Sequence, residues 1–271
     1  MKKWMISIAM VMLATGLVAC GSESAEEVYT NAMEAAENMQ SAEVIISMNQ
    51  EMNLPSENAT VLMESDMEGS IITDPVSMHQ KGTMAMSMEG DGMENEIPMD
   101  VETEFYLVDN EIYMFESFSG QWMKADESMV PIDTLTSNQP DVSEQLEMME
   151  EYVEELDFEE SDDEFVFKLT ANGEDFTELT KQMLDEYMPE DITAELGDIT
   201  EVLEDMEIHN LDIEMYIDKE SYDLTKYNID MEMSMTIEGE EMNIIQKVDT
   251  VYKNINSIDS IEVPQEVLDA V

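Results

Sequence analysis

Apolar and polar positions alternate with a period of two over long parts of the chain. The clearest stretches lie at residues 43–52, 61–71, 76–88, 99–107, 211–217 and 227–238. Because successive side chains of a strand point to opposite faces of a sheet, each stretch predicts a strand with one dry and one wet face. Turn residues separate the stretches, as at Leu54–Asn58 and Thr73–Pro75, so neighbouring strands are expected to pair antiparallel.

Helical spacing interrupts this alternation at the start and in the middle of the sequence. Apolar residues three and four positions apart predict helices at 26–40, at 142–156, at 176–187 and, more weakly because of Gly197, at 192–203. Eight or nine strands divided by a helical middle indicate an α+β fold. Long strands with one apolar face tend to curl. We therefore expect a long antiparallel curved sheet, an open half-barrel, that wraps a few helices.

The N-terminus carries a targeting signal. Lys2 and Lys3 precede an apolar run from Trp4 to Val18, which ends at Leu17-Val18-Ala19-Cys20. A positive start, a short apolar run and small residues are typical of a secretory signal peptide. The last four residues resemble the bacterial lipobox, which implies cleavage before Cys20 and a diacylglycerol on its thiol. The alternative is an ordinary secreted protein whose single cysteine happens to lie there.

This interpretation divides the chain into three parts. Residues 1–19 are the predicted lipoprotein signal peptide, residues 20–25 a lipidated tether, and residues 26–271 a single half-barrel domain. Two acyl chains anchor a protein stably where one does not. The predicted location is extracytoplasmic, on the cell membrane, with palmitate-type acyl chains as the anchor.

The charge excludes one class of partner. The chain has 66 Asp and Glu against 10 Lys and no Arg, a formal net charge of −56. Nucleic acid needs clustered Lys or Arg, so it is excluded as a partner. Anionic headgroups would also repel the protein, so a lipid must hold it at a membrane. The carboxylates are interpreted as a solvated surface, with cation binding left as the alternative.

Three segments carry a resemblance to known proteins. They are Tyr113-Met114 with Gly120-Gln121-Trp122-Met123-Lys124, the run Met215–Tyr222, and Ile255-Asn256 with Ile261–Pro264. The chain resembles an uncharacterised family of Gram-positive surface lipoproteins, and is similar to LolA-like and LppX/LprG-type lipoproteins. The resemblance implies an open half-barrel around an apolar, lipid-binding cavity and implies no catalytic residues. The methionine and acid content departs from the family pattern, so the ligand stays open.

Catalytic and metal motifs are missing from the sequence. His79 and His209 belong to no metal-binding frame, and no nucleophile elbow, Walker or dinucleotide motif occurs. Asp91–Asn95 begins like a calcium loop, lacks the acid and glycine that follow, and is interpreted as a hairpin loop. We expect no enzyme, no cofactor and no metal site.

Methionine is unusually abundant, at 29 residues. Two blocks place it at alternate positions of a predicted strand, hence on one face, and Met48 with Met52 forms a looser third block. With their neighbours, the candidate cavity-lining residues are Met84, Met86, Met88, Met231, Met233, Met235, Ile213 and Met215. Three interpretations stay open: core packing, an adaptable cavity wall, and a thioether site for Cu(I). The favoured function is a carrier of an apolar ligand, a lipid or lipidated partner, and the alternative is a structural or interaction protein of the cell envelope with a filled core.

Overall fold

The computed structural model describes residues 23–55, 58–90, 99–125, 142–150, 156–171, 207–237 and 240–271. Its first strands are β1 (Ser41–Leu54), β2 (Ala59–Thr73), β3 (Val76–Gly90), β4 (Met99–Val108), β5 (Glu111–Glu116) and β6 (Gln121–Ala125). The later strands are β7 (Asp157–Glu160), β8 (Glu164–Ala171), β9 (Glu207–Asp218), β10 (Leu224–Ile237) and β11 (Glu240–Lys253). The helices are α1 (Ala25–Glu37), α3 (Val142–Glu150) and α7 (Gln265–Leu268).

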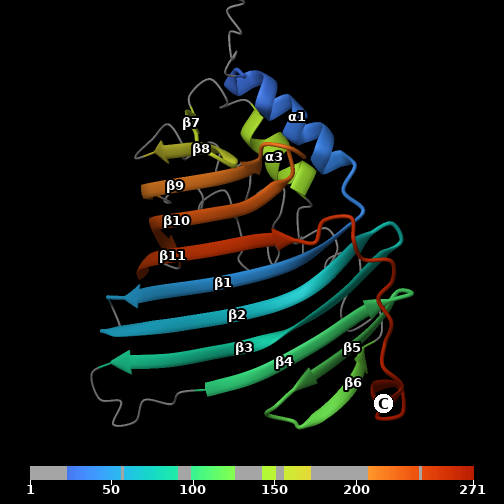
Figure 1. Cartoon of the computed structure of the whole chain (residues 1–271). Coiled ribbons are helices and arrows are strands. Elements are labelled where there is room, and N and C mark those ends of the chain that lie inside the picture. The colour runs from blue at the N-terminus through green and yellow to red at the C-terminus, as the bar shows by residue number, and fades with distance from the viewer. Residues whose placement is uncertain are drawn as a thin grey trace, which may run out of the picture.

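All of these strands belong to one antiparallel sheet. Their order is β6-β5-β4-β3-β2-β1-β11-β10-β9-β8-β7. The pairing of β1 with β11, in which Met48 lies opposite Val248, joins the first half of the sheet to the second. Figure 1 shows the strands stacked into a strongly curved surface, with α1 and α3 beside its β7–β9 end. The expected fold class, a curved antiparallel sheet with a few helices, is confirmed.

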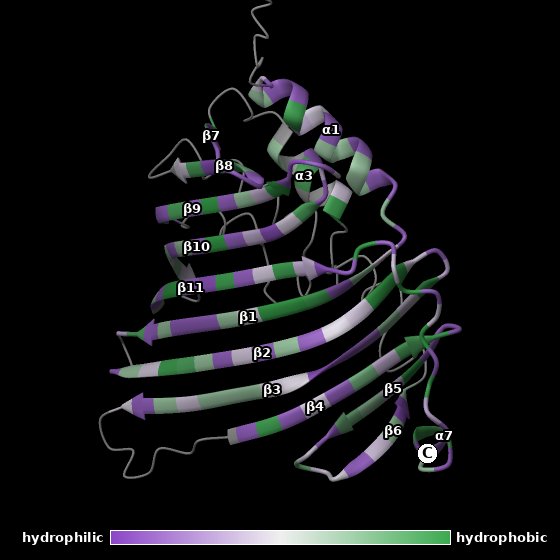
Figure 2. Ribbon diagram, viewed as in Figure 1, coloured by the Kyte–Doolittle hydropathy of each residue, from purple (hydrophilic) through white to green (hydrophobic). Residues whose placement is uncertain are grey.

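The two faces of the sheet differ in chemistry. We call the face that contacts α1 and α3 the helix-side face, and the opposite one the outer face. The pairing register places the odd positions of β2 and the even positions of β1 and β3 on the helix-side face. Apolar and polar residues therefore alternate along most strands, as Figure 2 shows.

Helix α1 begins at a complete capping box. The Ser24 hydroxyl accepts a hydrogen bond from the Glu27 amide, and the Glu27 carboxylate accepts one from the Ser24 amide. These bonds satisfy donors that the first turn would otherwise leave free. The helix buries Val28, Tyr29 and Ala32.

The main core lies between the two helices and the β8–β11 part of the sheet. Val142, Leu146 and Met149 of α3 share it with α1 and with fully buried side chains of β8 and β9 such as Phe167. The Tyr29 ring meets Phe167 edge to face, with ring centroids 5.5 Å apart. The helices thus fill one end of the helix-side face.

The C-terminal segment, residues 254–271, follows β11 and crosses to the outer face. The Asn256 amide donates to the carbonyl of Ser41 over 2.7 Å, and its side-chain oxygen accepts from the Gln40 amide over 2.6 Å. Farther along, Val267 of α7 is buried against Tyr106 and Tyr113. Two of the segments that carried the resemblance, around residues 113–124 and 255–264, therefore meet in the fold.

Several expectations need correction. The described part of the chain contains eleven strands, not eight or nine, and β7 at one edge of the sheet was not expected. The helix expected over 142–156 has its described part at Val142–Glu150, and Asp157–Glu160 then forms β7 against β8. The expected N-terminal helix ends at Glu37, before Gln40.

Other expectations fall outside the described residues. They are the signal peptide 1–19, Cys20, the loop 91–95 and the helices expected at 176–187 and 192–203. Among the described residues, no helix is long and apolar enough to cross a bilayer.

Candidate functional site

The predicted methionines share the helix-side face with further methionines from other strands. Met86 of β3 lies opposite Met63 of β2, and Met88 lies opposite Val61. On β10, Met235 lies opposite Met242 of β11. Directly opposite residues of antiparallel strands have their side chains about 5 Å apart on one face. The structure therefore brings both methionine blocks onto one surface, together with Met63 and Met242.

Burial divides the candidate residues into two groups. Ile213 and Met215 of β9 are 1% and 0% exposed and pack in the core beneath the helices, and Met233 is also buried. Met84 of β3 is 37% exposed, and the neighbouring Met86 and Met88 are half-buried. Met231 and Met235 are half-buried at the margin of the core. The β3 block is thus the accessible part of the methionine surface.

Strands β1–β4 carry no charged residue at any helix-side position. Their helix-side side chains are apolar apart from small or neutral polar groups such as Ser65 and Gln80, which are 8% and 9% exposed. The same strands place carboxylates such as Asp66 and Glu68 on the outer face. Although the chain has 66 acidic residues, every charged side chain of these four adjacent strands therefore lies at an outer-face position.

Two glycines shape this surface. Gly69 of β2 and Gly82 of β3 occupy helix-side positions where a Cβ would lie 2.1 Å from the His79 carbonyl oxygen and 2.0 Å from that of Asp66. Glycine within a strand often marks a place where another backbone approaches closely. The backbones of β2 and β3 therefore lie closer together here than any residue with a Cβ atom would allow.

Polar and aromatic side chains gather on the outer face. His79 stacks on the Tyr106 ring at 4.2 Å, and both side chains hydrogen bond to Glu104. Burial, helped by the Glu104 contact, raises the pKa of Tyr106 to about 12. His209 contacts the Ser234 hydroxyl over 2.9 Å, also on the outer face.

The Cu(I) interpretation gains no support from these positions, since neither imidazole lies on the methionine surface. In the part of the chain that the structure describes, no three His, Cys, Asp or Glu side chains come together as a metal site.

Three grooves formed by described residues lie on or beside the outer face. They have volumes of about 460, 270 and 570 Å³. The first lies over Gly82, between Ile45 and Phe115, and the last lies between the C-terminal segment and the turns of β2–β3 and β4–β5. None of the three is lined by Met84, Met86 or Met88. These outer grooves could not be predicted from local sequence patterns, because they depend on strand pairing and on the position of the C-terminal segment.

Residues 24–271 match the family of unknown function DUF6612. The chain belongs to this family. No curated protein matches it by sequence.

Solved structures with a similar arrangement include two mycobacterial proteins. LprF from Mycobacterium bovis is 12% identical, with a TM-score of 0.41 over 89% of this chain and 96% of that one. The lipoprotein LppX from Mycobacterium tuberculosis is 11% identical, with a TM-score of 0.38 over 88% of this chain and 98% of that one. Membership of an uncharacterised family, expected from the sequence, is confirmed by the match over residues 24–271.

Proposed function

We propose that the protein is a membrane-anchored extracytoplasmic lipoprotein that binds or carries an apolar ligand, a lipid or lipidated partner, on its methionine-rich helix-side face. The observation that carries this proposal is the absence of charge from the helix-side positions of β1–β4, combined with the accessibility of Met84. A filled core would also exclude charge, whereas on this uncharged face Met84 is 37% exposed and its neighbours Met86 and Met88 are half-buried.

Methionine suits such a surface. Its side chain is unbranched and polarizable, so it adapts to partners of ill-defined shape, such as acyl chains. The accessible block on β3 continues across the sheet to Met63 and Val61 of β2. An acyl chain lying across these strands would contact side chains from both and would meet no carboxylate.

The first experiment asks whether a ligand is present. The protein is purified from its own host, extracted with organic solvent, and the extract is analysed by mass spectrometry. We expect one class of lipid in stoichiometric amount. Extracts without lipid, together with no binding of a fluorescent fatty acid, would contradict the carrier proposal and favour the structural alternative.

The second experiment locates the binding surface. Met84, Met86 and Met88 are replaced together by Gln, which keeps the side-chain length and adds polarity. If each position loses contact with about one CH₂ group of the ligand, at about 0.8 kcal/mol each, the affinity for a fluorescent fatty acid falls about 50-fold. The matched control changes Thr83, Ala85 and Ser87 of the same strand to Gln, on the outer face, and should bind as the parent does. Equal losses in both variants would contradict this location.

The anchor has its own test. Cys20→Ser should abolish incorporation of radiolabelled palmitate, because the acylated thiol is then missing. Labelling that persists in this variant would contradict the lipobox interpretation of Leu17–Cys20.

A further inference from the structure

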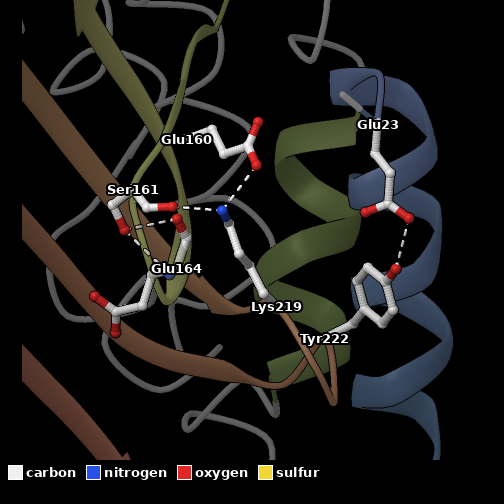
Figure 3. A network of polar contacts seen from close by, with 6 residues as sticks. All are labelled: Glu23, Glu160, Ser161, Glu164, Lys219 and Tyr222. Atoms are coloured by element: carbon white, nitrogen blue, oxygen red, sulfur yellow. Dashed lines mark hydrogen bonds and ion pairs between the residues drawn. The ribbon is translucent and has the colours of Figure 1, made fainter. Parts of the chain in front are cut away.

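Two turns at the β7–β10 end of the sheet are locked together by Lys219. Its ammonium group pairs with the Glu160 carboxylate over 2.8 Å and donates to the carbonyl oxygen of Ser161 (Figure 3). It also lies over the Phe165 ring, 5.3 Å from the centroid. Lys219 stands in the β9–β10 turn, and its partners lie in the β7–β8 turn or in the strand residues beside it, so Lys219 joins the two turns into one unit.

The same unit holds the first described residue of the chain. Tyr222, at the end of the β9–β10 turn, donates a hydrogen bond to the Glu23 carboxylate over 2.7 Å, as Figure 3 shows. The Tyr222 ring stacks on Phe165, with an interplanar angle of 14°. One residue farther on, Ser24 caps α1. The backbone is therefore fixed to the β7–β10 end from Glu23 onward.

The distance from Cys20 to this fixed point is short. Three peptide steps separate Cys20 from Glu23, and a fully extended chain spans at most about 3.6 Å per residue, or about 11 Å in all. A diacylglycerol on Cys20 would thus place Glu23, and with it the two locked turns, close to the headgroups. This step rests on the lipid anchor of the proposed function.

We propose that the surface formed by the β7–β8 turn, the β9–β10 turn and the N-terminus of α1 is the face that the protein presents to the membrane. Its exposed residues, such as Asp162, Asp163 and Glu220, are polar. It therefore rests at the headgroup level without inserting, and its carboxylates fit zwitterionic headgroups better than anionic ones.

The opposite edge of the sheet then projects away from the bilayer. Nine strand-to-strand steps separate β8 from β6 in the sheet, which at about 4.8 Å each amounts to about 43 Å along its surface. Figure 1 shows the strands stacked from the α1 end down to β6. The tip of the β5–β6 hairpin, where Phe118 is 87% exposed, lies at this distal edge.

The orientation can be measured by labelling introduced cysteines, because the chain has a single cysteine of its own. Cys20 is the one cysteine of the chain, so once it is acylated an introduced cysteine is the sole free thiol. The full chain is produced in a host that lipidates it, as Asp162→Cys or, as the matched distal control, Phe118→Cys. Each is labelled with a fluorophore and placed in phosphatidylcholine vesicles that contain a lipid with a nitroxide on its headgroup.

We expect the label at position 162 to lose most of its emission and the label at position 118 to keep it. Equal quenching at both positions, or stronger quenching at position 118, overturns the orientation. Flotation with the vesicles is measured on the same samples. Protein that does not float lacks the anchor, which overturns both proposals, whereas flotation without a difference between the labels overturns the orientation alone.

Tether length provides a second control. A flexible insert of about 20 Gly and Ser residues between Ser22 and Glu23 has a root-mean-square length of about 25 Å, about twice the longest span of the natural tether. In this background the label at position 162 should recover emission while the protein still floats. Quenching that is unchanged by the insert would overturn the role of the short tether.

Discussion

Gly82→Ala should destabilise the protein far more than an alanine in a strand ordinarily does. The added Cβ would lie 2.0 Å from the Asp66 carbonyl oxygen and 2.7 Å from the Sδ of Met67. Ordinary contact begins at 3.4 Å, so β2 and β3 must separate by about 1.4 Å at this point. The thioether can rotate away, but the carbonyl belongs to the backbone of the paired strand. The strain therefore falls on the β2–β3 hydrogen bonds.

The magnitude follows from three contributions. Losing about two ladder hydrogen bonds costs about 1 kcal/mol each, and overpacking costs about 1–3 kcal/mol. Alanine returns about 0.5–1 kcal/mol through its smaller loss of backbone entropy. The free energy of unfolding should fall by about 3 kcal/mol.

Gly90→Ala on the same strand is the matched control. There the Cβ would meet Ala59 and Asn58 at 3.2–3.4 Å, so small shifts suffice. We expect a change within about 1 kcal/mol, because mild crowding opposes the entropy gain.

Urea unfolding measures both variants. In a chain without residues 1–19, Trp122 is the one tryptophan, and its ring lies 5.5 Å from Phe115 and 5.9 Å from Tyr106. Its emission therefore reports the loss of tertiary packing, and linear extrapolation gives the free energy of unfolding. A Gly82→Ala protein as stable as the parent, or a Gly90→Ala protein equally destabilised, would refute the argument from close strand approach.

Three further predictions concern charge and the C-terminal segment. The Ser221 and Glu220 amides hydrogen bond to the Asp218 carboxylate and lower its pKa, so its stabilisation is present above the unfolded pKa of about 3.9 and is lost as pH falls through the folded value. Asp218→Asn should therefore lower the urea midpoint at pH 6, with a difference from the parent that shrinks on acidification; a constant difference would count against this. Val267→Ala should cost about 1–2 kcal/mol through lost contact with Tyr106 and Tyr113 and shift the Trp122 emission, whereas unchanged emission and stability would show that α7 does not hold the outer face. Because the many carboxylates behind the net charge of −56 repel one another, the melting temperature should rise as NaCl is increased from about 10 mM to about 1 M. A melting temperature that does not change with salt would contradict this.

The strands were predictable where one face is dry and the other wet. The alternation around Met84 or Met231 assigns each side chain to a face without any knowledge of its partner strand, and the structure places both on the helix-side face. Phe158 was not predictable in this way. The preceding Leu156 continues the helical spacing of α3, and only the pairing of Phe158 with Phe167 makes its segment a strand.

Contacts between distant segments were beyond the reach of local patterns. In the sequence, Gly82 looks like an ordinary strand glycine. Only the position of the Asp66 carbonyl shows that no larger residue fits there. Tyr222 lies in a recognisable turn, but its bond to Glu23 spans 199 residues. Val267 likewise becomes a core residue only because the C-terminal segment crosses the outer face.

The distribution of charge links the proposed ligand surface to the proposed orientation. The lysines of the described residues that form ion pairs do so on the outer face or in turns, as Lys81 does with Glu68 and Lys219 with Glu160. The helix-side positions of β1–β4 are left without charge of either sign. A ligand on Met84 would therefore be held by apolar contact alone, so its affinity should depend little on salt, whereas folding stability should depend on it strongly. Measuring the binding of an uncharged fluorescent acyl ester and the melting temperature over the same NaCl series separates the two, and parallel changes would place the ligand on the charged outer face instead.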